Sequence, residues 1–267
     1  MVANGGLGWG CSMRLHTLTW GNIKSDRSVV LIHGVTSNAQ SWIRVGPKLA
    51  EQGYYVVAPN LRGHGQSEKA DGHYSLLEMA GDLAENCPNN PEFVIGHSFG
   101  GVMAITAEEN GFLNAEYIVL EDPVLHFADK ALPARLLKND EANLPRSIEG
   151  ILESNPKWAR IDAEGKLASL ESINWDHMKQ VFSDNAPWDL RSSVVEIVKK
   201  KPIWLILPET SFYVPENDAN KLREALGTDA VINIPGTDHS IHRDDIDTFL
   251  KTVNQWISGA RAQTGNP

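Results

Sequence analysis

Gly96-His97-Ser98-Phe99-Gly100 is the stretch that decides the fold of this chain, because of what lies on either side of it. An apolar run, residues 93–95, leads into the stretch, and a run of small residues, 102–107, leads out. A serine between a buried strand and a helix must lie on a tight turn, and the two glycines leave room for that turn and for close helix–sheet packing. The pattern predicts that Ser98 Oγ is exposed above the edge of a sheet. A Ser-Gly-rich loop without chemistry is the alternative.

Short apolar runs alternate with helical patterns along the rest of the chain. The expected strands are residues 15–20, 29–32, 55–58, 93–95, 117–120, 203–207 and 231–234, and the expected helices are residues 41–52, 76–85, 99–110, 216–226 and 244–257. Uninterrupted apolar strands are typical of a sheet that helices cover on both faces. The alternation predicts an α/β protein with a doubly wound, mostly parallel sheet.

One segment, between Pro123 and Lys201, shows no strand signal but is too long and too apolar to be a loop. It holds three of the eight tryptophans, Trp158, Trp175 and Trp188. The segment leaves directly after a strand, so part of it must face the carboxyl end of the sheet. We expect a helical cap at residues 124–201, inserted late into a core formed by residues 1–123 and 202–267. A helical subdomain that merely buries its own aromatic side chains is the alternative.

Length, charge and cysteine content limit the classes of protein to which this chain can belong. The chain has 267 residues, 42% of them hydrophobic, which is enough for one large core. A net charge of -10 argues against nucleic acid or an anionic membrane as a partner, since both attract basic surfaces. Two cysteines are too few for a disulfide scaffold, and residues 1–10 lack the apolar core of a signal peptide. We expect a cytoplasmic protein and leave open whether it is a homo-oligomer.

Four motifs together resemble the α/β-hydrolase superfamily over nearly the whole chain. Besides the Ser98 stretch, they are His33-Gly34 after the first buried strand, Arg62-Gly63-His64-Gly65-Gln66-Ser67 after the next, and Gly236-Thr237-Asp238-His239 after the last. The family uses the chain order nucleophile, acid, histidine. The resemblance implies a serine nucleophile with a catalytic triad and an oxyanion hole.

The serine would need a base and a pair of hydrogen-bond donors. A serine hydroxyl is a poor nucleophile at neutral pH and requires a nearby base. His239 is the best candidate, and His242, three residues further on, is its rival. The backbone N–H groups of Phe99, at a helix start, and Val35, just after His33-Gly34, are the expected oxyanion donors. A plain strand-ending turn is the alternative for His33-Gly34.

The acid departs from the common family pattern. Most members carry an aspartate after the penultimate strand, where this chain has Ser211, with Glu209 slightly earlier. Some branches of the family place the acid one strand earlier, where this chain has Glu121-Asp122. One helix and one strand separate Ser98 from Asp122, which returns the chain to the same sheet edge. Asp122 is our first choice for the triad acid, Glu121 the second and Glu209 a further alternative; Glu121-Asp122 could instead only cap the strand.

The reaction implied by the resemblance is hydrolysis of an ester, lactone or related acyl bond through an acyl-enzyme. The chemistry of relatives with an aspartate nucleophile does not carry over to Ser98, and the sequence marks no metal site and no cofactor. The expected partner is a small-molecule acyl substrate, small to medium-sized and largely apolar. The candidate substrate-binding residues are Trp42, Trp158, Trp175, Trp188 and Phe212. A carbon–carbon bond hydrolase or lyase of the same fold and a non-catalytic ligand receptor remain as alternatives, and an arginine facing the cleft would favour a carboxylate substrate.

Overall fold

A seven-stranded sheet forms the centre of the computed structural model, which describes residues 13–70, 72–129 and 131–264. The strand order is β1-β3-β2-β4-β5-β8-β9. The strands are β1 (Thr17–Trp20), β2 (Ser28–Ile32), β3 (Tyr55–Pro59), β4 (Phe93–His97), β5 (Tyr117–Glu121), β8 (Ile203–Pro208) and β9 (Val231–Ile234). Only the pairing of β1 with β3 is antiparallel in this sheet. The predicted α/β class with a mostly parallel sheet is confirmed.

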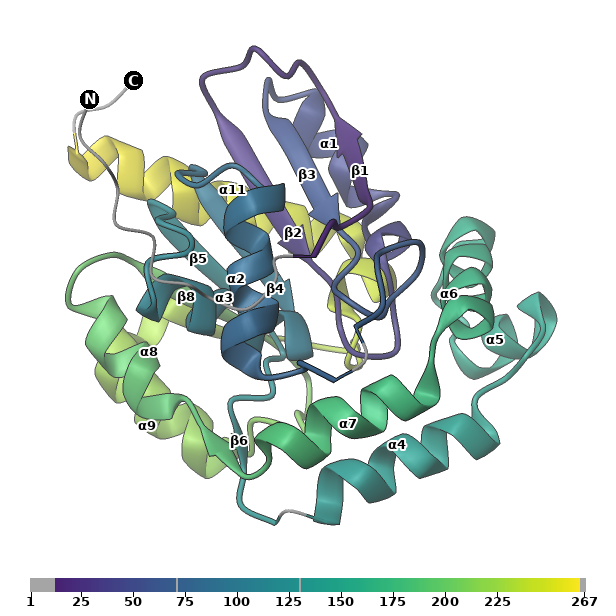
Figure 1. Cartoon of the computed structure of the whole chain (residues 1–267). Coiled ribbons are helices and arrows are strands. Elements are labelled where there is room, and N and C mark those ends of the chain that lie inside the picture. The colour runs from purple at the N-terminus through teal and green to yellow at the C-terminus, as the bar shows by residue number, and fades with distance from the viewer. Residues whose placement is uncertain (1–12, 71, 130, 265–267) are drawn as a thin grey trace, which may run out of the picture.

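Helices cover both faces of the sheet (Figure 1). The helices α2 (Leu76–Asn86), α3 (Phe99–Glu109), α8 (Arg191–Val198) and α9 (Glu216–Leu226) pack on one face, and α1 (Val45–Ala50) and α11 (Ile246–Thr264) on the other. Along β2, Val30 and Ile32 join the first core, whereas Val29 and Leu31 join the second. Because successive side chains of a strand point to opposite faces, each buried strand supplies both cores.

Two expected helices differ from their predicted bounds. The helix expected at residues 41–52 is divided into a 3-10 turn, η1 (Ala39–Trp42), and α1. The last helix is preceded by α10 (Ile241–Asp244) and extends to Thr264. Asp245 separates α10 from α11: its backbone is not helical, and its carboxylate accepts a hydrogen bond from the Thr248 amide at 3.0 Å. The side chain thereby satisfies an N–H of the first turn of α11. A second 3-10 turn, η2 (Thr228–Ala230), leads into β9.

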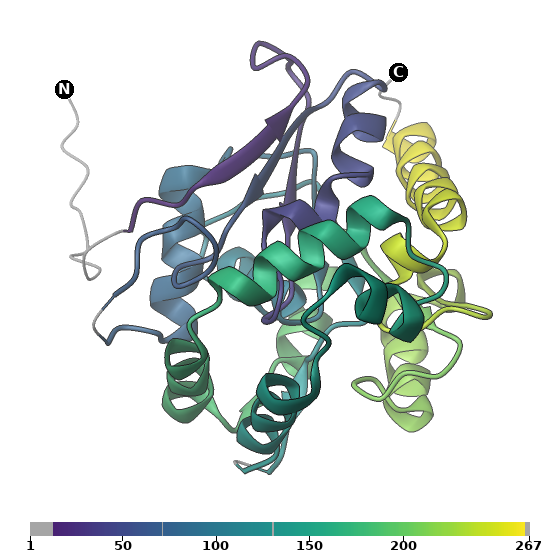
Figure 2. The ribbon, with the colours of Figure 1, turned by 90° about the vertical axis from the view of Figure 1, so that its right-hand side faces the viewer.

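Among its described residues, the segment expected to form a cap contains five helices and one unexpected ladder. One of the helices, α8, packs on the sheet. The others, α4 (Ala131–Asn143), α5 (Ile148–Ser154), α6 (Arg160–Ser172) and α7 (Trp175–Asn185), lie together to one side of the sheet (Figures 1 and 2). Our expectation that the segment holds no strand is wrong, because β6 (His126–Phe127) pairs antiparallel with β7 (Trp188–Asp189). This ladder joins the beginning of the segment to its end. Two-residue strands are too short to leave an alternating pattern.

Among the described residues, no helix is long and apolar enough to cross a membrane. Cys87 is a free thiol, and burial raises its pKa to about 12, so it is unreactive at neutral pH. Residues 1–10 and Cys11 lie outside the described residues.

Candidate active site

Ser98 occupies the sharp turn between β4 and α3. Its backbone has φ 56° and ψ −118°, a conformation that costs a non-glycine residue about 1–3 kcal/mol. The glycines on either side permit the close approach that the turn requires: a Cβ at Gly96 would lie 2.4 Å from Gly100 O, and a Cβ at Gly100 would lie 2.1 Å from Ile32 O. The turn is therefore held under strain by packing of α3 against β2 and β4.

Asp122 and His239 meet at the same edge of the sheet. Asp122 follows β5, which neighbours β4 with His97 opposite Glu121. His239 Nδ1 lies 2.6 Å from Asp122 Oδ2, so Nδ1–H donates to the carboxylate and leaves Nε2 free to accept a proton. The Asp122 side chain is 2% exposed and that of His239 is 34% exposed. A buried acid thus fixes the tautomer of an accessible imidazole.

Ser211, at the position where the family pattern predicts an aspartate, is joined to this pair. Its hydroxyl donates to Asp122 Oδ1 at 2.5 Å and accepts from the Val214 amide at 2.8 Å. Both oxygens of Asp122 are therefore occupied, one by the imidazole and one by the serine. Glu209 accepts from the Gly236 amide at 2.9 Å instead of bonding to His239.

The second-choice acid and the rival histidine form a separate buried pair. His242 Nδ1 lies 2.8 Å from Glu121 Oε2, and the His242 amide donates to Glu121 Oε1 at 2.8 Å. Trp42 stacks on the His242 ring with 4.4 Å between centroids. The pair ties α10 to the end of β5 and has no access to solvent, since both side chains are at most 1% exposed.

A hydrogen bond from His97, the residue before Ser98, also holds the loop that carries His239. His97 Nε2 donates to the His239 carbonyl at 2.9 Å, and the Ser98 amide donates to the Glu121 carbonyl at 2.9 Å. Burial, then the neighbouring His239 and His242, lower the pKa of His97 well below its ordinary value. His97 is therefore neutral, which suits a donor that positions a loop.

The two residues expected to supply the oxyanion donors line the same cavity as Ser98. Phe99 is the first residue of α3, and the first N–H groups of a helix have no partner within it. Val35 lies in the turn after β2, and in the described part of the chain its amide has no hydrogen-bond acceptor. His64 Nε2 donates to the Val35 carbonyl at 2.7 Å, and His33 Nε2 accepts from the Leu61 amide at 3.0 Å. These two histidines shape the loop that carries the Val35 amide.

A narrow cavity of about 30 Å³ opens beside Ser98. It is lined by Val35, Ser98, Phe99, Val124, Phe127, Pro133, Leu136, Leu137, Asp140, Phe182, Trp188 and Tyr213. Most of these side chains are apolar, and several come from the segment expected to form the cap. Burial raises the pKa of Tyr213 to about 12 and raises that of Asp140, so the cavity is poorly hydrated around both groups.

Of the five side chains expected to bind substrate, Trp188 lines the cavity and the other four lie elsewhere. Trp42 is buried under His242, and the Trp158 Nε1–H donates to Asp244 at 2.9 Å. Trp175 packs with the Arg146 guanidinium 5.4 Å from its ring, and Phe212 is 64% exposed. Each has a partner or an orientation that depends on tertiary packing, which composition does not reveal.

The sequence interpretation missed two polar residues of the cavity wall. Asp140 comes from α4 and Tyr213 directly follows Phe212, which we had chosen instead. A loop has no periodic pattern that could distinguish Tyr213 from its neighbour Phe212. The polar face of α4, which carries Asp140, has the sequence pattern of a helix face exposed to solvent. In the described part of the chain, no group of three or more His, Cys, Asp or Glu side chains could hold a metal ion.

The chain matches a protein-family model and is similar in part to several known proteins. The model of the alpha/beta hydrolase family matches residues 29–252. A soluble epoxide hydrolase from Corynebacterium sp. (strain C12) is 39% identical over 184 residues, 64% of this chain and 60% of that protein. An uncharacterized protein from Mycobacterium bovis is 38% identical over 84 residues, 30% of this chain and 24% of that protein. The aligned part thus spans about a quarter of that relative.

A structural comparison supports the same fold. The crystal structure of E-2-(acetamidomethylene)succinate hydrolase superimposes with a TM-score of 0.75 and 20% identity, covering 92% of this chain and 96% of that one. The strained turn at Ser98, the sheet order and the family match agree with one another. The chain belongs to the alpha/beta hydrolase family.

Proposed function

We propose that this protein is a serine hydrolase that cleaves an ester, lactone or related acyl bond through an acyl-enzyme. The contact between His239 Nδ1 and Asp122 Oδ2, at 2.6 Å, is the observation that carries the proposal. It links an acid and a base at the sheet edge where Ser98 holds a strained turn. Nucleophilic catalysis by serine needs this sequence of acid, imidazole and hydroxyl.

The proposed reaction has two halves. In the first, His239 Nε2 accepts the proton of Ser98 Oγ as the oxygen attacks the substrate carbonyl, and Asp122 stabilises the imidazolium. The Val35 and Phe99 amides stabilise the negative oxygen of the tetrahedral intermediate. The imidazolium then protonates the leaving group, and an ester to Ser98 remains. In the second half, His239 deprotonates a water molecule that attacks this ester and releases the acid.

The cavity wall favours a largely apolar acyl group, which we propose to be small to medium-sized. Apolar side chains such as Phe127, Phe182 and Trp188 form most of the wall and suit an aliphatic or aromatic acyl chain. The serine at position 98 favours acyl chemistry over the epoxide opening named for the Corynebacterium relative. We propose residues 124–201 as a cap over the site, since α4, α7 and β7 supply part of the wall.

An aryl-ester assay with a fluorophosphonate probe tests this proposal. We expect turnover of p-nitrophenyl esters by the whole chain, loss of turnover in Ser98→Ala, and labelling of the wild type alone by the probe. Failure of both labelling and turnover contradicts the hydrolase and favours a ligand receptor. Labelling without ester turnover would instead favour a carbon–carbon bond hydrolase or lyase.

A further inference from the structure

Two cations converge on the loop that follows the Val35 amide. Lys166, on α6, donates through Nζ to the Thr36 carbonyl at 2.8 Å and to Thr36 Oγ1 at 2.9 Å. Arg243, at the end of the turn after His239, donates through Nη2 to Ser37 Oγ at 3.3 Å. Thr36 and Ser37 directly follow Val35. Two positive groups therefore lie beside the proposed oxyanion hole.

Neither cation is neutralised by an adjacent carboxylate. Among the described residues, no carboxylate oxygen lies within 4.0 Å of a side-chain nitrogen of Lys166 or Arg243. Arg243 is 3% exposed, its Nε–H has no hydrogen-bond partner in the described part of the chain, and its guanidinium lies 4.4 Å from the centre of the Trp158 ring. A buried cation without a close counter-ion is costly, so such groups are usually paired.

The carboxylates that attract Arg243 are bonded to other groups. Asp162 accepts from Arg44 at 2.8 Å. Glu121 is held by His242, and Asp244 accepts from Trp158 Nε1 at 2.9 Å. None of the three carboxylates therefore pairs directly with Arg243, although their charges still act on it.

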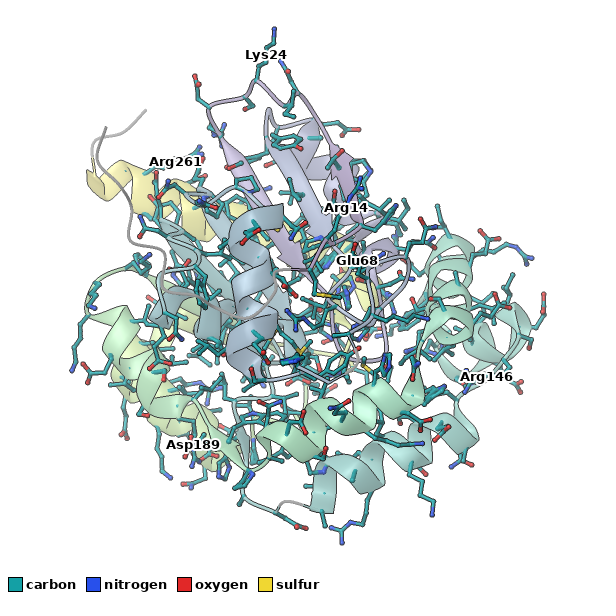
Figure 3. The ribbon with its side chains drawn as sticks, in the orientation of Figure 1. Arg14, Lys24, Glu68, Arg146, Asp189 and Arg261 are labelled. Atoms are coloured by element: carbon teal, nitrogen blue, oxygen red, sulfur yellow. The ribbon has the colours of Figure 1, made fainter. Side chains whose placement is uncertain are left out.

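A third cation, Arg146, also acts on Lys166 and lies among the helices of the proposed cap (Figure 3). Its guanidinium donates to the Leu170 and Glu141 carbonyls, both at 3.1 Å, and so has neutral partners. Burial, followed by the repulsion of Arg243, lowers the pKa of Lys166 to about 7. The charge of Asp140 opposes this lowering only in part.

Asp140 connects this cation cluster to the cavity. It lines the wall beside Ser98, and its charge interacts with those of both Lys166 and His239 without a hydrogen bond to either in the described part of the chain. Lys166 Nζ has three N–H donors, of which Thr36 uses two. One donor of the protonated Lys166 therefore remains for a ligand.

We propose that Lys166, supported by the field of Arg243, binds a carboxylate of the substrate, so that the preferred substrate is an acyl compound with a second, ionised carboxyl group. This inference rests on the proposed hydrolase function and names its substrate class. The substrate carboxylate would bond directly to Lys166, as no carboxylate of the described residues does, and this bond orients the scissile carbonyl toward the neighbouring Val35 amide.

A matched pair of esters tests the inference. The mono-p-nitrophenyl ester of glutaric acid and p-nitrophenyl valerate have acyl chains of the same length and differ by the terminal carboxylate. We expect the ratio of their kcat/KM values, glutarate over valerate, to fall about ten-fold in Lys166→Gln, because a charge-assisted hydrogen bond is lost. Glutamine still offers an N–H to Thr36. Lys138→Met, an exposed lysine on α4, is the control and keeps the wild-type ratio.

Two results would overturn the inference. One is a wild-type ratio no higher than that of Lys166→Gln; the other is an equal loss for both esters, which would mean that Lys166 only holds the Thr36 loop. If the wild type hydrolyses neither ester, the proposed function fails, and calorimetry with Ser98→Ala decides the subsite separately. Tighter binding of the glutarate ester, lost in Ser98→Ala/Lys166→Gln, supports the subsite, whereas equal binding of both esters contradicts it.

Discussion

Ser211 stands where the common family pattern has an aspartate, and Asp122, at the end of the neighbouring strand, contacts His239 instead. An aspartate after the penultimate strand would approach His239 from β8, whereas Asp122 approaches it from β5. The Ser211 hydroxyl donates to the Asp122 carboxylate at 2.5 Å. Both oxygens of this buried carboxylate therefore accept a hydrogen bond, one from Ser211 and one from His239.

Replacement of Asp122 by asparagine tests its role. We expect Asp122→Asn to lower kcat by about 10³–10⁴-fold, because the imidazole loses the acceptor that fixes its tautomer and stabilises its charged form. Circular dichroism melting should show a folded protein. The control is Glu121→Gln, which disturbs the buried pair with His242 and should lower the Tm more than Asp122→Asn does. A larger loss of kcat in Glu121→Gln than in Asp122→Asn would assign the acid to Glu121.

Ser211 should act through Asp122 rather than on the substrate. We expect Ser211→Ala to lower kcat about ten-fold with little change in KM, since a hydrogen bond to a charged acceptor contributes roughly 1.5–3 kcal/mol. Steady-state kinetics on an aryl ester provide the measurement. Thr210→Ala, at an exposed neighbour, should leave both constants unchanged. An increase of KM alone would show that Ser211 contacts substrate instead.

At the scale of elements, the contact of α3 with β2 determines whether the turn at Ser98 can form. A methyl group at Gly100 would lie 2.1 Å from the Ile32 carbonyl oxygen, a distance that only a backbone shift can relieve. We expect Gly100→Ala to destabilise the fold by about 1–3 kcal/mol or more, as overpacking does. Chemical denaturation measures this change.

A second glycine provides the matched control. Gly259, in α11, has no described atom within 4 Å of the position of a Cβ, apart from its chain neighbours and the backbone of its own helix. Gly259→Ala should therefore stabilise the protein by roughly 0.5–1 kcal/mol through helix propensity. Equal effects of the two alanines would contradict a packing requirement at Gly100.

At the scale of the whole molecule, Lys166, which joins α6 to the Thr36 loop, links stability to pH. The link arises because the pKa of Lys166 differs between the folded and the unfolded chain. Its pKa is lowered from 10.5 to about 7, mainly by burial. Between these values the unfolded chain binds the proton and the folded chain does not, so stability rises with pH through this window. We expect the Tm of the wild type relative to that of Lys166→Met to increase from about pH 6 to about pH 10. A constant difference in Tm would contradict the shifted pKa.

Much of the fold, and the contacts of Asp122, could be predicted from the sequence because both follow from chain order. Apolar runs mark the parallel strands, and one helix and one strand return the chain from Ser98 to Asp122 at the same edge. The cavity wall could not be predicted in this way. Which face of a cap helix turns inward depends on its neighbours, so Asp140 was missed, and Trp158 covers Arg243 instead of a substrate.

Mass spectrometry of the protein quenched during turnover of an aryl ester tests the central claim most directly. The account predicts one covalent acyl group for each chain, attached to the peptide that contains Ser98, and more of it in Asp122→Asn if deacylation becomes the slower step. The adduct should be absent from Ser98→Ala. Turnover by the wild type with an acyl group on another residue, or turnover by Ser98→Ala at the wild-type rate, would contradict a serine acyl-enzyme at this site.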